Sequence, residues 1–250
     1  MQRNVLAAFS IIGIIAFLGF TARLNRSSPA PPQELNVISR TRGDEFLSAE
    51  VLNNELRIRL KNNHKDTITA FAISFRDTTI KVDFAYSEVN SGIQPGDTFQ
   101  KNYPIFTSAS ASEPFPLYLV TVLLNDGTND GDSKIAEEIK DERLGEKIQV
   151  LRTLRILEKQ RQSLKDLKTI KTDLVDALNA SESKTRIALN ELQPNSRIDQ
   201  KLADHLKNGL QVGREKMLER FLVLEQLPPD YQEQGFMELK ERLNKLFAKL

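Results

Sequence analysis

Residues 55–75 read ELRIRLKNNHKDTITAFAISF, and this stretch decides how the N-terminal half of the chain folds. Up to Leu60, apolar residues alternate with charged ones, which is the pattern of a strand with one buried face. The polar segment Asn62–Asp66 then predicts a turn, and Thr67–Phe75 predicts the returning strand. The stretch therefore indicates antiparallel β-structure rather than helix.

The same two-residue period continues on both sides of this stretch, from Leu35 to Asn125. A Pro-Gly turn at Gln94–Asp97 precedes a further strand. Leu117–Leu124 is apolar on both faces, as a strand in the middle of a sheet would be. A run of roughly six to eight short strands, separated by turns, predicts an antiparallel sandwich of two sheets.

Two of the turns resemble those of the small immunoglobulin-like modules of bacterial exported and membrane-anchored proteins. The residues are Lys61-Asn62-Asn63 followed by Thr67–Phe71, and then Ile93-Gln94-Pro95-Gly96-Asp97. In such modules a strand ends in a polar Asn turn, and an Ile-x-Pro-Gly-acid turn opens a later strand. The resemblance covers about residues 35–125. It implies an Ig-like β-sandwich outside the cytoplasm, and it carries no functional residues.

The N-terminal segment Val5–Ala22 has no charged residue. Eighteen helical residues would extend about 27 Å, close to the roughly 30 Å of the hydrocarbon layer. A cleaved signal peptide is the alternative, because Arg3 supplies a short basic start. Phe20 stands where cleavage needs a small residue, so we expect a retained transmembrane anchor.

After Gly131 the apolar residues recur at the three-and-four spacing of an α-helix. Apolar stripes run through residues 157–178, 198–224 and 236–247, and Gly145 is expected to bend or interrupt the first helix. Antiparallel helices would pack these stripes together. The predicted fold class is therefore α+β and multi-domain, with an N-terminal transmembrane helix, an antiparallel Ig-like β-sandwich and a C-terminal helical hairpin or bundle.

The predicted domains are a transmembrane signal-anchor at 1–24, a Pro/Ser-rich linker at 25–34, an Ig-like β-sandwich at 35–126 and an α-helical hairpin or bundle at 127–250. Arg23 and Arg26, on the C-terminal side of the anchor, favour a cytoplasmic location for the sandwich and the helices. The sandwich itself favours export. We expect a single-pass membrane protein with the bulk of the chain outside the cytoplasm, in the periplasm or at the cell surface.

The polar segment after Leu124 has oxygen-bearing side chains at the spacing of an EF-hand-type loop. Gly131 occupies the place of the sharp turn. These residues are the candidate calcium ligands: Asp126, Thr128, Asp130, Asp132 and Glu137. The alternative is a polar connection in which Asp132 or Ser133 caps the following helix. Calcium is the one cofactor that the sequence suggests.

Composition and motifs do not favour catalysis. The chain has 35 basic and 34 acidic residues, so net charge gives no argument for nucleic acid. The absence of cysteine excludes thiolate nucleophiles and cysteine metal sites. The two histidines are His64 and His205, and no HExxH, G-x-S-x-G or Gly-rich phosphate loop occurs. We expect a protein that is not an enzyme.

The segment Lys147–Lys171 contains eight basic and two acidic residues. Its basic positions do not form one stripe on a helical wheel, and no aromatic residue is interleaved for base stacking. Our preferred hypothesis is a membrane-anchored, non-enzymatic interaction or scaffold protein that binds a protein partner or itself, with no small-molecule substrate and no nucleic acid. The alternative is a cytoplasm-facing membrane protein whose basic helix 147–171 binds anionic lipid or nucleic acid.

Overall fold

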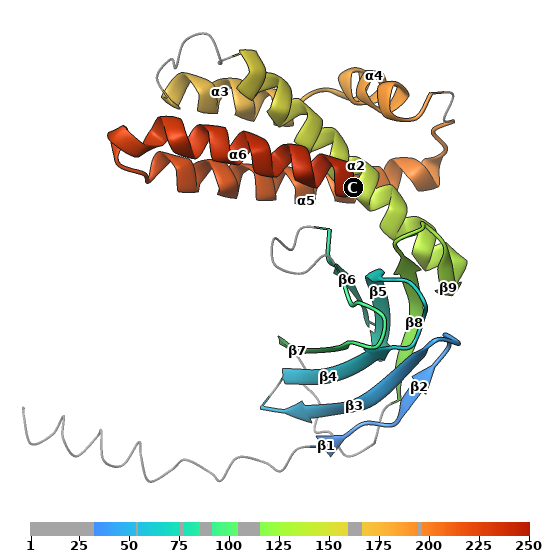
Figure 1. Cartoon of the computed structure of the whole chain (residues 1–250). Coiled ribbons are helices and arrows are strands. Elements are labelled where there is room, and N and C mark those ends of the chain that lie inside the picture. Colours follow the sequence, from blue (N-terminus) through green and yellow to red (C-terminus); the bar gives the residue numbers. More distant parts are fainter. Residues whose placement is uncertain are drawn as a thin grey trace, which may run out of the picture.

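The computed structural model comprises two β-sheets and, next to them, a layer of helices (Figure 1). It describes residues 33–53, 55–75, 78–85, 92–104, 116–159, 167–194 and 197–250.

Sheet A has the strand order β1-β3-β4-β7, and all its neighbouring strands are antiparallel. Its strands are β1 (Gln33–Glu34), β3 (Asp44–Leu52), β4 (Glu55–Asn62) and β7 (Thr98–Pro104). The alternation predicted for β4 is found, because Leu56, Ile58 and Leu60 are fully buried while the residues between them are not.

Sheet B has the order β2-β8-β5-β6, and β9 also pairs with β8. Its strands are β2 (Val37–Ser39), β5 (Ile68–Phe75), β6 (Thr78–Asp83), β8 (Leu117–Leu124) and β9 (Asn129–Gly131). Strand β2 runs parallel to β8, whereas the other pairs are antiparallel. The prediction of a wholly antiparallel sandwich was therefore wrong.

The predicted returning strand also pairs differently from our expectation. β5 does not pair with β4 but crosses into sheet B, where β6 and β8 are its neighbours. The physical reason is burial: most of β5 is buried on both faces, whereas β4 has one buried face. Asn62 stabilises the crossover from a fully buried position, donating hydrogen bonds from Nδ2 to the carbonyl oxygens of Asp66 (2.9 Å) and Ile93 (2.7 Å).

The two sheets pack face to face around an apolar core. Three rings fill one part of it, with centroids 5.2 to 6.0 Å apart: Phe71, Phe84 and Phe99. Strand β1 begins at Gln33 and β9 ends at Gly131, so the β-structure extends on both sides of the predicted range 35–126.

The helices are α2 (Ser133–Lys159), α3 (Leu167–Leu178), α4 (Glu182–Leu192), α5 (Gln200–Glu225) and α6 (Pro229–Lys249). The N-terminal part of α2 packs against sheet B, and its C-terminal part forms an apolar core with α3, α5 and α6 (Figure 1). The stripe predicted over residues 157–178 therefore belongs to two helices, α2 and α3.

No helix in the described part of the chain is long and apolar enough to cross a membrane. The predicted anchor, Val5–Ala22, lies outside the described residues. This finding corrects the predicted fold class, which included a transmembrane helix, and the predicted location as a single-pass membrane protein. The structure supports an α+β fold of two sheets and, in the described ranges, five helices.

Helices α2 and α5 touch backbone to backbone through glycines. A Cβ built on Gly209 would stand 2.0 Å from the carbonyl oxygen of Glu142, and one on Gly145 would stand 2.6 Å from that of Leu206. Gly145 does not interrupt the helix, because α2 runs as one helix of 27 residues that includes it. Gly145 is instead a point where α5 approaches α2.

We predict that Gly209→Ala destabilises the protein. Alanine in a helix is ordinarily better than glycine by about 1 kcal/mol, but here its methyl group would overlap the Glu142 carbonyl. We expect overpacking to dominate and the free energy of unfolding to fall by about 1–3 kcal/mol in urea titrations. The control is Asn208→Ala at the neighbouring exposed position, which should change stability by less than about 0.5 kcal/mol. Equal stability of the two variants would contradict the close contact.

Candidate functional site

The joint between sheet B and α2 has a small apolar contact at its centre. Ala70 and Ala72 of β5 face Ile139 of α2, and Leu123 of β8 completes the cluster. All four side chains are buried. Because alanine side chains are short, the helix backbone can lie close to the sheet.

Ion pairs surround this contact. Arg143 of α2 binds the Asp83 carboxylate through two nitrogens, at 2.7 and 2.8 Å, and donates from Nη2 to the carbonyl oxygen of Thr69 at 2.8 Å. Lys81 binds both Glu138 and Glu142 of α2. Burial alone would lower the pKa of Lys81, but the hydrogen bonds to these two carboxylates raise it. The position of α2 on the sheet is therefore fixed by several charged contacts at once.

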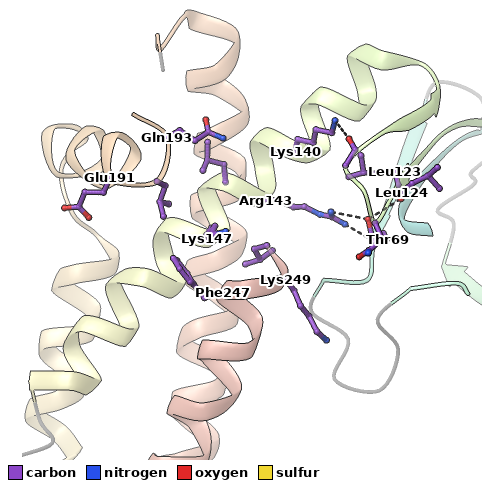
Figure 2. A pocket seen from close by; sticks show the side chains of 15 residues that line it. Thr69, Leu123, Leu124, Lys140, Arg143, Lys147, Glu191, Gln193, Phe247 and Lys249 are labelled. Atoms are coloured by element: carbon purple, nitrogen blue, oxygen red, sulfur yellow. Dashed lines mark hydrogen bonds between the residues drawn. The ribbon is translucent and has the colours of Figure 1, made fainter. Parts of the chain in front are cut away.

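An open cleft of about 570 Å³ lies beside this joint, between the end of sheet B, α2, and the C-terminal ends of α4 and α6 (Figure 2). Its apolar walls come from all of these elements. They include Leu124, Leu144, Leu192 and Phe247.

Four basic side chains line the cleft, namely Lys140, Arg143, Lys147 and Lys249. Its one acidic side chain, Glu191, binds Arg155. Asp83 compensates the charge of Arg143, but within the described ranges no carboxylate lies within ion-pair distance of the three lysines.

Two of these lysines are held by neutral partners. Lys140 donates to the carbonyl oxygen of Gly127 at 2.6 Å, and the ammonium of Lys147 lies 4.9 Å from the centre of the Phe247 ring. Neither partner carries a charge, but the charge of Lys140 also helps to lower the pKa of Asp126 and of Glu137, which lie near it without forming an ion pair. The cleft can therefore bind an anionic group that has apolar atoms attached.

The predicted calcium ligands are not brought together. Asp126 accepts hydrogen bonds from the N–H and hydroxyl of Thr128, Asp130 accepts one from the N–H of Arg42, and Glu137 binds Lys201. The hydrogen bonds from Thr128 lower the pKa of Asp126, and the one from Lys201 lowers that of Glu137. Among the residues described, no group of three or more acidic or histidine side chains could hold a metal ion. Calcium binding stays a prediction.

Asp132 has the structural role that we considered as the alternative. Its Oδ1 accepts hydrogen bonds from the N–H groups of Lys134 (2.8 Å) and Ile135 (3.3 Å) at the start of α2. These N–H groups have no partner inside the helix, so the aspartate caps it.

We predict that Asp132→Ala lowers the free energy of unfolding by about 1 kcal/mol, because two N–H groups of α2 lose their acceptor. The loss should be the same in EDTA and in millimolar calcium, as measured by thermal or urea unfolding. The control is Asp176→Ala at an exposed position of α3 outside the calcium candidates, which should change stability by less than about 0.5 kcal/mol. A loss that appears only with calcium would instead identify Asp132 as a calcium ligand.

Among the described basic residues of 147–171, several are bound by different parts of the protein. Arg152 is buried and donates to the neutral acceptors Gln149 and Thr185, and burial lowers its pKa. Arg155 and Lys171 pair with glutamates on α4 and α5. Residues 160–166 lie outside the described residues.

Sequence reasoning missed the cleft. Lys140 and Lys249 fell outside the basic segment that we considered, and only Lys147 fell inside it. A usable signal was present, because Lys140, Arg143 and Lys147 follow the i, i+3, i+7 spacing of one helix face. Nothing in the local sequence links Lys249 to that face, since α6 meets it only through the tertiary fold.

Comparisons with protein-family models, curated proteins and solved structures gave no match.

Proposed function

We propose that this protein is a non-enzymatic interaction module, and that its cleft binds an acidic, partly apolar segment of a partner protein. The observation that carries the proposal is the combination of three lysines that form no ion pair in the described ranges and walls made of leucine and phenylalanine. Acidic side chains of a partner would form ion pairs with these lysines, and its apolar side chains would cover the walls.

The type of cation suits a protein ligand. Lysine ammonium groups are point charges on flexible stems, and they accept carboxylates from many directions. Arginine would favour planar, bidentate recognition of one phosphate or carboxylate, but the one arginine of the cleft, Arg143, is occupied by Asp83 and Thr69.

The edge of sheet A at β7 is a poorer binding surface than the cleft. Strand β7 is an edge of sheet A, and Lys101 at its centre stands opposite Ile58 in the pairing register. Ile58 points into the core, so Lys101 is on the core-facing side of the edge strand. An inward charge on an edge strand opposes pairing with a further strand, whether from another copy or from a partner.

The contacts of α2 also favour a cleft that is preformed in the absence of a partner. Its main wall, α2, is fixed to sheet B by Arg143 and Lys81 and to α5 by the glycine contacts. A preformed site loses little conformational entropy on binding, which supports recognition of a short segment.

We predict that an acidic peptide with leucine and phenylalanine residues binds the protein, as measured by fluorescence anisotropy. The same peptide with glutamine in place of each glutamate should bind at least about tenfold more weakly, because it brings no countercharge. Binding of the acidic form should weaken as salt is added.

The double variant Lys140→Gln/Lys147→Gln should reduce the affinity for the acidic peptide to that of the neutral one. The matched control is Lys134→Gln/Lys207→Gln, which removes the same charge from exposed positions on α2 and α5 outside the cleft. Equal binding of both peptides, or an equal loss in both double variants, would overturn the proposed function.

A further inference from the structure

Arg152 of α2 is a buried charge without a countercharge. The residue is 8% exposed, and its guanidinium donates hydrogen bonds to the side-chain oxygens of Gln149 (3.1 Å) and Thr185 (2.8 Å). Both acceptors are neutral, and within the described ranges no carboxylate forms an ion pair with Arg152. Proteins rarely bury a charge without pairing it, because the loss of hydration is costly. The surroundings of Arg152 therefore favour a bound anion.

The guanidinium of Arg152 points at the first turn of α4. Helix α3 ends at Leu178 and α4 begins at Glu182, beside α2 (Figure 1). Thr185, which accepts from Arg152, is the fourth residue of α4. The positive end of the α4 dipole therefore lies next to the positive charge of Arg152. The one acidic residue of this turn is Glu182, whose side chain is 92% exposed and lies 3.8 Å from Arg186 instead.

The same turn has hydrogen-bond donors that α4 does not use. The N–H groups of residues 182–184 begin the helix, so they have no acceptor inside it. Ser181 precedes them, but its side chain makes no capping hydrogen bond, and its Oγ lies 2.9 Å from that of Ser183. Backbone N–H groups and two hydroxyl groups are therefore available at this end of α4.

We propose that Arg152 and the first turn of α4 form a binding site for a phosphate group, either free phosphate or a phosphate monoester. The N–H groups of the turn and the hydroxyls of Ser181 and Ser183 bind its oxygens, and Arg152 supplies the countercharge. A phosphate suits the turn better than a carboxylate, because its several oxygens reach several donors at once. The site is separate from the cleft, which is lined by the other end of α4 at Glu191 and Leu192.

Titration of inorganic phosphate into the full chain, followed by amide NMR shifts, tests this site. The starting protein is the Lys140→Gln/Lys147→Gln variant, which reduces binding of phosphate in the cleft, and chloride keeps the ionic strength constant. We expect saturable shifts of the amides of residues 182–185 at millimolar phosphate, and a higher thermal midpoint in phosphate than in chloride. If these amides do not shift, or shift equally in chloride, the proposal is overturned.

Charge-removing variants in this protein identify the countercharge. Arg152→Gln should weaken phosphate binding at least about tenfold, whereas Arg152→Lys, which keeps the charge, should retain most of it. The matched control is Lys184→Gln, which removes the same charge from an exposed position of the same turn and should change the affinity by less than about twofold. Equal weakening by Arg152→Gln and Lys184→Gln would show attraction to general surface charge and would contradict the site.

Ser181→Asp keeps Arg152 and stays informative if Arg152→Gln does not fold. The introduced carboxylate would cap α4 and supply the countercharge within the chain. We expect the thermal midpoint to rise without phosphate, and phosphate to lose its effect on both the midpoint and the amide shifts. Phosphate binding as tight as in the starting protein would contradict the site.

Phenyl phosphate, titrated beside inorganic phosphate, separates the two sources of the phosphate group. Tighter binding of phenyl phosphate indicates a phosphate carried by a larger molecule, and tighter binding of inorganic phosphate indicates the free ion. Either result supports the site, and binding of neither overturns it.

Discussion

The ion pair between Arg143 and Asp83 determines how the two halves of this protein meet. It lies at the point where α2 leaves sheet B, and the same guanidinium also donates a hydrogen bond to the Thr69 carbonyl oxygen near the start of the neighbouring strand β5. Its partner, Asp83, ends the edge strand β6, so this one arginine joins the helix to two adjacent strands. Lys81, two residues earlier, adds two contacts to α2. Side chains that are largely removed from water make such contacts directional, and they oppose rotation of the helix on the sheet.

The positions of α4, α5 and α6 relative to the sheets depend on α2. The helix is long enough to contact sheet B near its start and the other helices further along (Figure 1). Glycines on both helices bring α5 against it, and α6 and α4 then end beside the same face of α2. The cleft is a consequence of this arrangement, because three separate segments converge where the joint leaves space between them. Its positive charge comes from lysines that form no ion pair in the described ranges, although the chain as a whole is nearly neutral.

The predictions from sequence succeeded where the signal was local. The alternation of residues 56–60 predicted one buried face, and β4 has it. The change of period after Gly131 predicted the start of the helical region, and α2 begins at Ser133 with Asp132 as its cap. The local sequence did not predict which strands pair with each other. β5 crosses to the second sheet because both of its faces become buried, one by the core and the other by α2, and an apolar run does not reveal what will cover it.

The sequence by itself therefore determined the kinds of element and many of the residues that face a core, since periodicity and capping depend on neighbours along the chain. Only the tertiary structure decided the pairing of the strands, the role of Gly145 as a helix contact and the cleft. The spacing of Lys140 and Lys147 in the sequence already places them on one face of a helix. They line a cleft only because Phe247 and Lys249, about a hundred residues later, fold against that face. The physical reason is that a binding site is a balance of charges and surfaces in space, and residues about a hundred positions apart enter that balance only after the chain has folded.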